Sequence, residues 1–133
     1  MAGIVFFKND ILSLVDHHIA ILERFGIKDE APFSIIYFHL DSKFKKSGME
    51  ILKKILRKTD AIFGDHEDYI IVLPGTDWNG SMELLRGIQE FLSQEEQDNI
   101  VTYPDDGEDS VTLLEKLYHT VKKNSGREIS LIS

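Results

Sequence analysis

The sequence predicts an α+β fold in a single domain over residues 1–133. Segments with apolar residues three or four positions apart, typical of helices, alternate with short β-branched and aromatic runs, typical of strands. Two strand-like runs, 60–64 and 69–73, are separated by four polar residues, which favours a β-hairpin. With 42% hydrophobic and 29% charged residues, the chain has the composition of one soluble domain.

The individual elements follow from the spacing of the apolar residues. A helix is expected over about 9–25, where Gly26 suits a C-cap, so that residues 1–26 form an N-terminal helical segment packed on the domain or leading into it. Phe33–Leu40 is a continuous β-rich run, as in a buried central strand. The other expected elements are strands over 60–64, 69–73, 99–103 and 128–132 and helices over 49–57, 82–92 and 110–123. This order predicts a ferredoxin-like sandwich, a mostly antiparallel sheet with a central hairpin and flanking helices.

Composition excludes several classes of protein. The absence of cysteine excludes disulfides, a thiol nucleophile and a cysteine-ligated zinc site. A net charge of −8 argues against a nucleic-acid partner. No apolar run approaches the ~20 residues that cross a bilayer, so no membrane partner is expected. The first residues lack the basic lead and cleavage pattern of a signal peptide, and we expect a cytoplasmic location.

Charge is unevenly distributed along the chain. Residues 43–58 contain seven basic side chains and one acid, whereas residues 87–115 contain nine acids and no base. Such runs are often only the solvated faces of helices. They are also what complementary patches would provide for a homodimer or for another protein partner. The apolar segment Ile4–Phe7 would add to such an interface, and both interpretations stay open.

Several segments resemble the GGDEF family of diguanylate cyclase domains, in the family's own order. Tyr69–Thr76 (YIIVLPGT) is similar to the strand and Leu-Pro-x-Thr that follow the family signature. Val101–Asp109 (VTYPDDGED) resembles a later strand and turn, and residues 113–127 resemble the helix that ends in Lys-x-x-Gly-Arg. Near the front, residues 10–14 resemble a shortened DxLTGL, and Phe33–Lys45 (FSIIYFHLDSKFK) resembles the strand that ends in DxDxFK. The resemblance implies the nucleotidyl-cyclase version of the ferredoxin-like fold.

The resemblance places the family signature on a hairpin that has lost both of its glycines. Counting back from the Leu-Pro at 73–74, the signature falls on Asp65, His66, Glu67, Asp68 and Tyr69. In the family the glycines let a nucleotide lie against bare backbone. Here an Asp and a His would fill that space, and the Asp would bring a negative charge toward a triphosphate. The acids of the third and fourth positions persist as Glu67 and Asp68.

The metal site implied by the family is also incomplete. Family members pair the third acid of the signature with the first Asp of DxDxFK to hold Mg²⁺, which prefers oxygen ligands. If Asp41 is the second Asp, the first position is His39; if the alignment is made on the Phe-Lys at 44–45, it is Leu40. Neither alignment supplies the carboxylate. His39, Glu67 and Asp68 could still hold a borderline ion such as Zn²⁺, or form an acidic tip without an ion.

Two further parts of the family's nucleotide site are altered. The segment that binds guanine and ribose is missing, because Lys46 runs almost directly into Gly48. Spacing from Tyr118 places Val121 at the phosphate-binding lysine position, with Lys122 one residue later. Cyclase activity needs metal, base pocket and glycine hairpin together. We therefore predict that this activity is lost, with no catalytic residue, no metal and no cofactor.

One feature of the family's product-binding inhibitory site is retained in form. Arg57 and Asp60 make an R-x-x-D pattern just before the hairpin. An arginine can bind a guanine edge or a phosphate through two N–H groups, and an aspartate can accept from the guanine amide. In the other interpretation Arg57 is a solvated helix end and Asp60 a residue at the entry to a strand.

These observations lead to three hypotheses of function. The first is a catalytically inactive GGDEF-like module that acts in bacterial-type signalling as a regulatory or protein-interaction domain. The second is an effector that binds cyclic di-GMP through Arg57 and Asp60. The third is a residual nucleotide-processing enzyme that uses the tip formed by His39, Glu67 and Asp68.

Overall fold

The computed structural model describes residues 3–129 and has an α+β fold, as predicted. The strands of this described part form one mixed five-stranded sheet in the order β1-β3-β4-β2-β5. The strands are β1 (Ile4–Phe6), β2 (Phe33–His39), β3 (Ala61–Asp65), β4 (Asp68–Pro74) and β5 (Ile100–Tyr103). The helices are α1 (Ile11–Arg24), α2 (Lys45–Ile55), α3 (Trp78–Phe91) and α4 (Ser110–Ser125), with 3-10 turns at Lys8–Asp10 and Ser42–Phe44.

The strand β2 organises the sheet. It pairs antiparallel with β4 along its whole length, from Phe33 opposite Pro74 to His39 opposite Asp68, and its first half also pairs antiparallel with β5. The hairpin β3–β4 is antiparallel, and β1 joins the sheet as a parallel edge strand beside β3. Since β5 begins at Ile100, opposite Ile36, the last residues of β2 extend beyond it.

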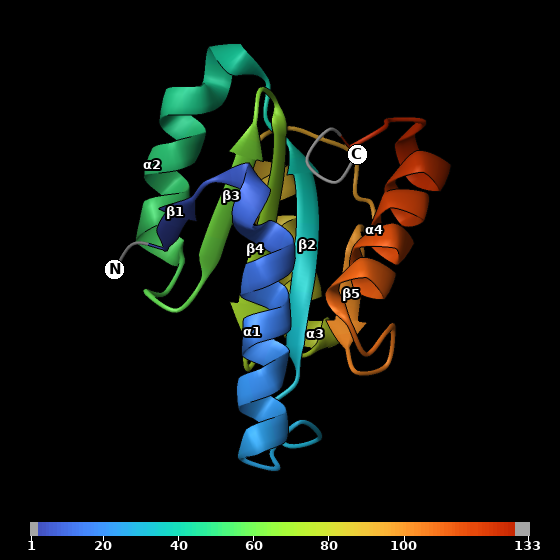
Figure 1. The fold of residues 1–133 in the computed structure, drawn as a ribbon. Coiled ribbons are helices and arrows are strands. Elements are labelled where there is room, and N and C mark those ends of the chain that lie inside the picture. The colour runs from blue at the N-terminus through green and yellow to red at the C-terminus, as the bar shows by residue number, and fades with distance from the viewer. Residues whose placement is uncertain (1–2, 130–133) are drawn as a thin grey trace.

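Helices cover both faces of the sheet, so the chain forms three layers (Figure 1). Because side chains alternate along a strand, β2 directs Phe33, Ile35 and Tyr37 to one face and Ile36 and Phe38 to the other. The first face packs against α1 and α4, and the second against α2 and α3. Burial on both sides explains why this strand is mostly apolar and aromatic in the sequence, with Ser34 as a buried polar exception.

The N-terminal segment differs from the prediction. The helix expected over about 9–25 is present as α1, from Ile11 to Arg24, but the N-terminal segment 1–26 also contains the strand β1 at Ile4–Phe6, which was not expected. In that strand Phe6 stacks on Phe63 of β3, with ring centroids 5.6 Å apart. The apolar segment Ile4–Phe7 is therefore partly used within the sheet, although Phe7 remains exposed. A three-residue strand is too short to produce a periodic signal.

Other boundaries also differ at the ends of elements. The helix α3 begins at Trp78 and not at Met82, because the Asp77 side chain accepts from the Gly80 amide at 2.9 Å and caps the helix four residues earlier. The expected strand over 128–132 is not formed at Glu128 or Ile129, and its remaining residues lie outside the described part of the chain. None of the helices within residues 3–129 combines the length and the apolar character of a membrane span.

Candidate functional site

The signature positions lie at one end of the sheet, where β2 ends and β3 turns into β4. Asp65 of β3 is opposite Asp68 of β4, and His39 of β2 is opposite Asp68 on the other side. The turn consists of His66 and Glu67, and His66 has a positive φ of 57°. The predicted hairpin is confirmed, with a tight turn of the kind that favours positive φ.

The Glu67 carboxylate joins this turn to the segment after β2. One oxygen accepts from the Ser42 amide at 2.8 Å, and the other lies 3.4 Å from Nε2 of His39. A backbone hydrogen bond joins the same two segments, since the Leu40 amide donates to the Glu67 carbonyl at 2.8 Å. Glu67 thus makes contacts within the protein at the position where the family's acid binds metal.

The carboxylate of Asp68 has a buried partner in β2. The Tyr37 hydroxyl donates to Oδ1 of Asp68 at 2.5 Å, a short distance typical of hydrogen bonds to a charged acceptor. Burial raises the pKa of the Tyr37 phenol far above its ordinary value, and the bond to Asp68 raises it further. The phenol is therefore a permanent donor to Asp68 at neutral pH.

The high pKa of Tyr37 gives a testable dependence of stability on pH. Above about pH 10 an unfolded chain releases the phenol proton while the folded chain keeps it, so stability falls as pH rises through this value. Burial raises the pKa of Tyr103 in the same direction. We expect Tyr37→Phe to reduce, but not abolish, the loss of unfolding free energy between about pH 8 and 11.

Urea denaturation at several pH values measures this effect. Tyr118→Phe on α4 is a matched control that removes one phenol without touching the bond between Tyr37 and Asp68. An alkaline slope in Tyr37→Phe equal to that of the wild type would contradict the buried bond between Tyr37 and Asp68.

The first two signature positions also make contacts within the chain. Asp65 forms an ion pair with Lys8 at 3.1 Å, and the exposed His66 ring lies 3.6 Å from the other Asp65 oxygen. A carboxylate at position 65 thus holds the 3-10 turn after β1 against the hairpin. The residue that the resemblance aligns with the first glycine of the signature thus has a structural partner that the sequence did not reveal.

The two residues that the alternative alignments place at the first Asp of DxDxFK, His39 and Leu40, have different surroundings. Leu40 is buried in the core between the sheet and α2, whereas His39 is the side chain that meets Glu67. Asp41 accepts from the Lys43 amide at 3.1 Å and so caps the 3-10 turn before α2. Among residues 3–129, no group of three or more His, Asp or Glu side chains is arranged to hold a metal ion.

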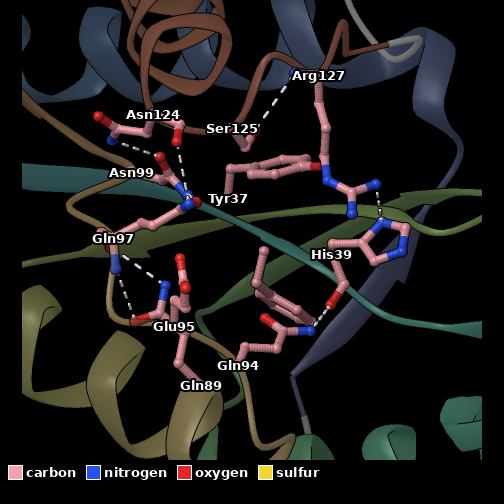
Figure 2. Close-up of a pocket in the computed structure, with 11 residues that line it drawn as sticks. Tyr37, His39, Gln89, Gln94, Glu95, Gln97, Asn99, Asn124, Ser125 and Arg127 are labelled. Atoms are coloured by element: carbon pink, nitrogen blue, oxygen red, sulfur yellow. Dashed lines mark hydrogen bonds between the residues drawn. The ribbon is translucent and has the colours of Figure 1, made fainter.

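Beside the end of β2 lies a polar cavity of about 410 Å³ (Figure 2). It occupies the space next to β2 beyond the start of β5, between the ends of α3 and α4. This volume is in the range of small-molecule pockets. The lining residues are Tyr37, Phe38, His39, Gln89, Gln94, Glu95, Gln97, Asn99, Asn124, Ser125 and Arg127.

One end of this cavity is formed by His39 and Arg127. Arg127 lies 3.1 Å from Nδ1 of His39 through Nη1, and since a guanidinium only donates, Nδ1 is the acceptor. The ring then carries its proton on Nε2, which faces Glu67. Gln94 donates to the carbonyl of His39 from the opposite side, as Figure 2 shows. His39 is therefore oriented by three neighbours.

The rest of the wall is an amide network that sequence reasoning missed. Asn124 donates to Asn99 at 2.9 Å, Gln97 donates to the carbonyl of Asn124 at 3.2 Å, and Gln89 donates to the carbonyl of Gln97 at 3.2 Å. The available signal was the density of Asn and Gln between positions 89 and 99. The two alternatives for the phosphate lysine do not line the cavity: Val121 is in the core, and Lys122 pairs with Glu128 at 3.0 Å.

Arg57 and Asp60 come together, but they bind each other. The Asp60 carboxylate is buried, accepts from the Arg57 amide at 2.8 Å and lies 3.0 Å from the Arg57 guanidinium. The guanidinium also donates to the Pro74 carbonyl at 2.8 Å and to the Thr76 hydroxyl at 2.9 Å. In addition, the Ile4 amide donates to the Asp60 carbonyl at 3.0 Å. This cluster joins the starts of β1 and β3 to the end of β4, at the opposite end of β4 from the signature hairpin.

No protein-family model matches this sequence, and neither does any curated protein.

Proposed function

We propose that this chain is a catalytically inactive GGDEF-like domain that serves as a cytoplasmic regulatory or protein-interaction module in signalling. The topology supports this proposal. The segment from β2 to β5 has the order β-α-β-β-α-β, its strands lie in the order β3-β4-β2-β5, and all neighbouring strands are antiparallel. That arrangement is typical of a ferredoxin-like core, with α2 and α3 as its two crossover helices.

The observation that carries the proposal is the environment of Glu67. Its carboxylate accepts from the Ser42 amide and faces the His39 imidazole, so the side chain opposite it is not a second carboxylate. Phosphoryl transfer with one or two metal ions depends on oxygen ligands that hold the metal, and here an imidazole faces Glu67 in place of a second carboxylate. The same hairpin replaces both signature glycines with larger side chains. A scaffold that keeps its shape but fills its nucleotide site with internal contacts is suited to binding and not to turnover.

Incubation with GTP and Mg²⁺ or Mn²⁺ tests the proposal directly. We expect no cyclic dinucleotide, and the same result for Glu67→Gln. Product formed by the wild type and lost in Glu67→Gln would contradict the proposal, and would identify the hairpin as an active site. Hydrolysis of GTP or ATP, followed in the same samples by phosphate release, tests the residual enzyme that would use His39, Glu67 and Asp68.

The cyclic di-GMP effector is the second proposal to be tested. It requires Arg57 and Asp60 to turn toward a ligand, whereas Nη2 of Arg57 already bonds the Asp60 carboxylate and the end of β4, and the Asp60 carbonyl accepts from the start of β1. We expect isothermal titration with cyclic di-GMP to give no heat of binding. Micromolar or tighter binding that Arg57→Lys abolishes would establish the effector function, since lysine keeps the charge but loses the two-pronged contact.

A further inference from the structure

The outer surface of α2 and α3 has an apolar groove that no side chain of residues 3–129 fills. The groove has a volume of about 370 Å³ and is lined by Ile51, Ile55, Glu83, Leu84, Gly87, Ile88 and Phe91. Ile55 and Phe91 are 43% and 51% exposed, which is unusual for side chains of this size side by side on one surface. The groove lies on the face of the domain away from α1 and α4, and it contains none of the residues of the polar cavity.

Gly87 adds a second, independent observation. It lies in the interior of α3, where glycine is less favourable than alanine for helix formation. A Cβ atom added at this position would meet no atom within 4 Å, so no contact inside the described chain requires a glycine here. A glycine that lines an apolar groove allows the close approach of a side chain or backbone from outside.

The charges on the two sides of the groove are opposite in sign. The exposed charged side chains of α2 are Lys45, Lys46, Glu50, Lys53 and Lys54, a basic set with one acid. On α3 the exposed charges are Glu83, Arg86 and Glu90, and Arg86 lies 3.6 Å from Glu96. A surface with one basic and one acidic side can complement a second copy of itself.

We propose that this groove is a self-association surface, in which α2 of one copy packs on α3 of a second copy across a two-fold axis that runs along the groove. An axis in that direction sets each basic α2 against an acidic α3. A two-fold axis across the groove would set lysines against lysines, which like-charge repulsion disfavours. In the proposed pairing Ile51 and Ile55 of each copy cover the open space above Gly87 of the other.

The experiment is sedimentation equilibrium of the full chain between about 10 µM and 1 mM, a range suited to weak dimers. We expect a monomer–dimer equilibrium in the wild type. Phe91→Lys should weaken it at least tenfold. Lys54→Glu and Glu83→Lys should each weaken it, and the double variant Lys54→Glu/Glu83→Lys should restore it, because the swapped charges again face each other across the axis.

The variant Gly87→Ala distinguishes an effect on dimerisation from an effect on the stability of the fold. Because the added methyl meets open space, the variant should raise the Tm by about 2–5 °C. The same methyl should weaken dimerisation, so that the more stable protein is the poorer dimer. The self-association surface rests on the proposed function, because it names a second copy of the chain as the partner of the interaction module. Self-association is measured by sedimentation and the loss of cyclase activity by nucleotide turnover. Each of the two proposals can therefore fail without the other.

Three outcomes would overturn the proposal. They are a wild type that stays monomeric over the whole range, a dimer that Phe91→Lys does not weaken, and single charge variants whose combination does not restore association. A monomeric wild type that binds an added amphipathic peptide in the groove would likewise overturn it, and would assign the surface to a different protein.

Discussion

Arg57→Ala is expected to lower the free energy of unfolding by about 2–3 kcal/mol, because it leaves a buried carboxylate without its cation. Asp60 is only 2% exposed, and after the change its carboxylate would keep the hydrogen bond from the backbone amide of residue 57. The guanidinium also bonds the Pro74 carbonyl and the Thr76 hydroxyl, so its loss loosens the end of β4 as well. The expected loss is smaller than for a fully buried ion pair, because the Arg57 side chain is half exposed.

Urea denaturation of Arg57→Ala measures this cost, with the neighbouring and exposed Lys58→Ala as the matched control. If the penalty comes from an uncompensated buried charge, Asp60→Asn added to Arg57→Ala should recover part of it. An Arg57→Ala protein as stable as the wild type would mean that Arg57 is free to bind a ligand. That result would contradict the structural role and favour the cyclic di-GMP effector.

The same pair shows how far the sequence alone can go. The three-residue spacing brings Arg57 and Asp60 together on a turn, so their proximity was predictable. Whether the guanidinium faces solvent or the protein depends on Pro74 and Thr76, which reach it only through the pairing of β3 with β4. A local motif thus predicts which residues meet but not whether the rest of the fold has already used their hydrogen bonds.

In the fold and in the cavity, too, features set by local sequence were predictable and features set by distant segments were not. The strand β2 was predictable because burial on both faces makes most of its residues apolar or aromatic, with Ser34 and His39 as the polar exceptions, and this pattern is visible in the local sequence. The strand β1 was not, since its three residues are held by the distant strand β3. The cavity was missed for the same reason: His39, Gln97 and Arg127 come from segments far apart in the chain, and only the end of β5 opposite Ile36 leaves room for it.

Gly64→Ala is expected to lower the free energy of unfolding by about 1–3 kcal/mol through overpacking. A Cβ atom at position 64 would lie 2.6 Å from Cε1 of Tyr69, its cross-strand neighbour in the hairpin. The Tyr69 ring cannot move away easily, because it is buried and stacks on Phe38 with ring centroids 5.7 Å apart. Gly64 therefore permits the ring of Tyr69, its partner on the opposite strand of the hairpin, to lie across its own strand.

Gly87→Ala is the matched control, since the same methyl group there meets open space and should stabilise the protein. The same glycine-to-alanine change is thus expected to lower the free energy of unfolding at position 64 and to raise it at position 87, both measured by urea denaturation. Tyr69→Leu combined with Gly64→Ala should recover part of the loss, because the smaller side chain removes the clash. A Gly64→Ala protein as stable as the wild type would show that the ring yields. Because Tyr69 directly follows Glu67 and Asp68, a displaced ring would also loosen their bonds to Ser42 and Tyr37.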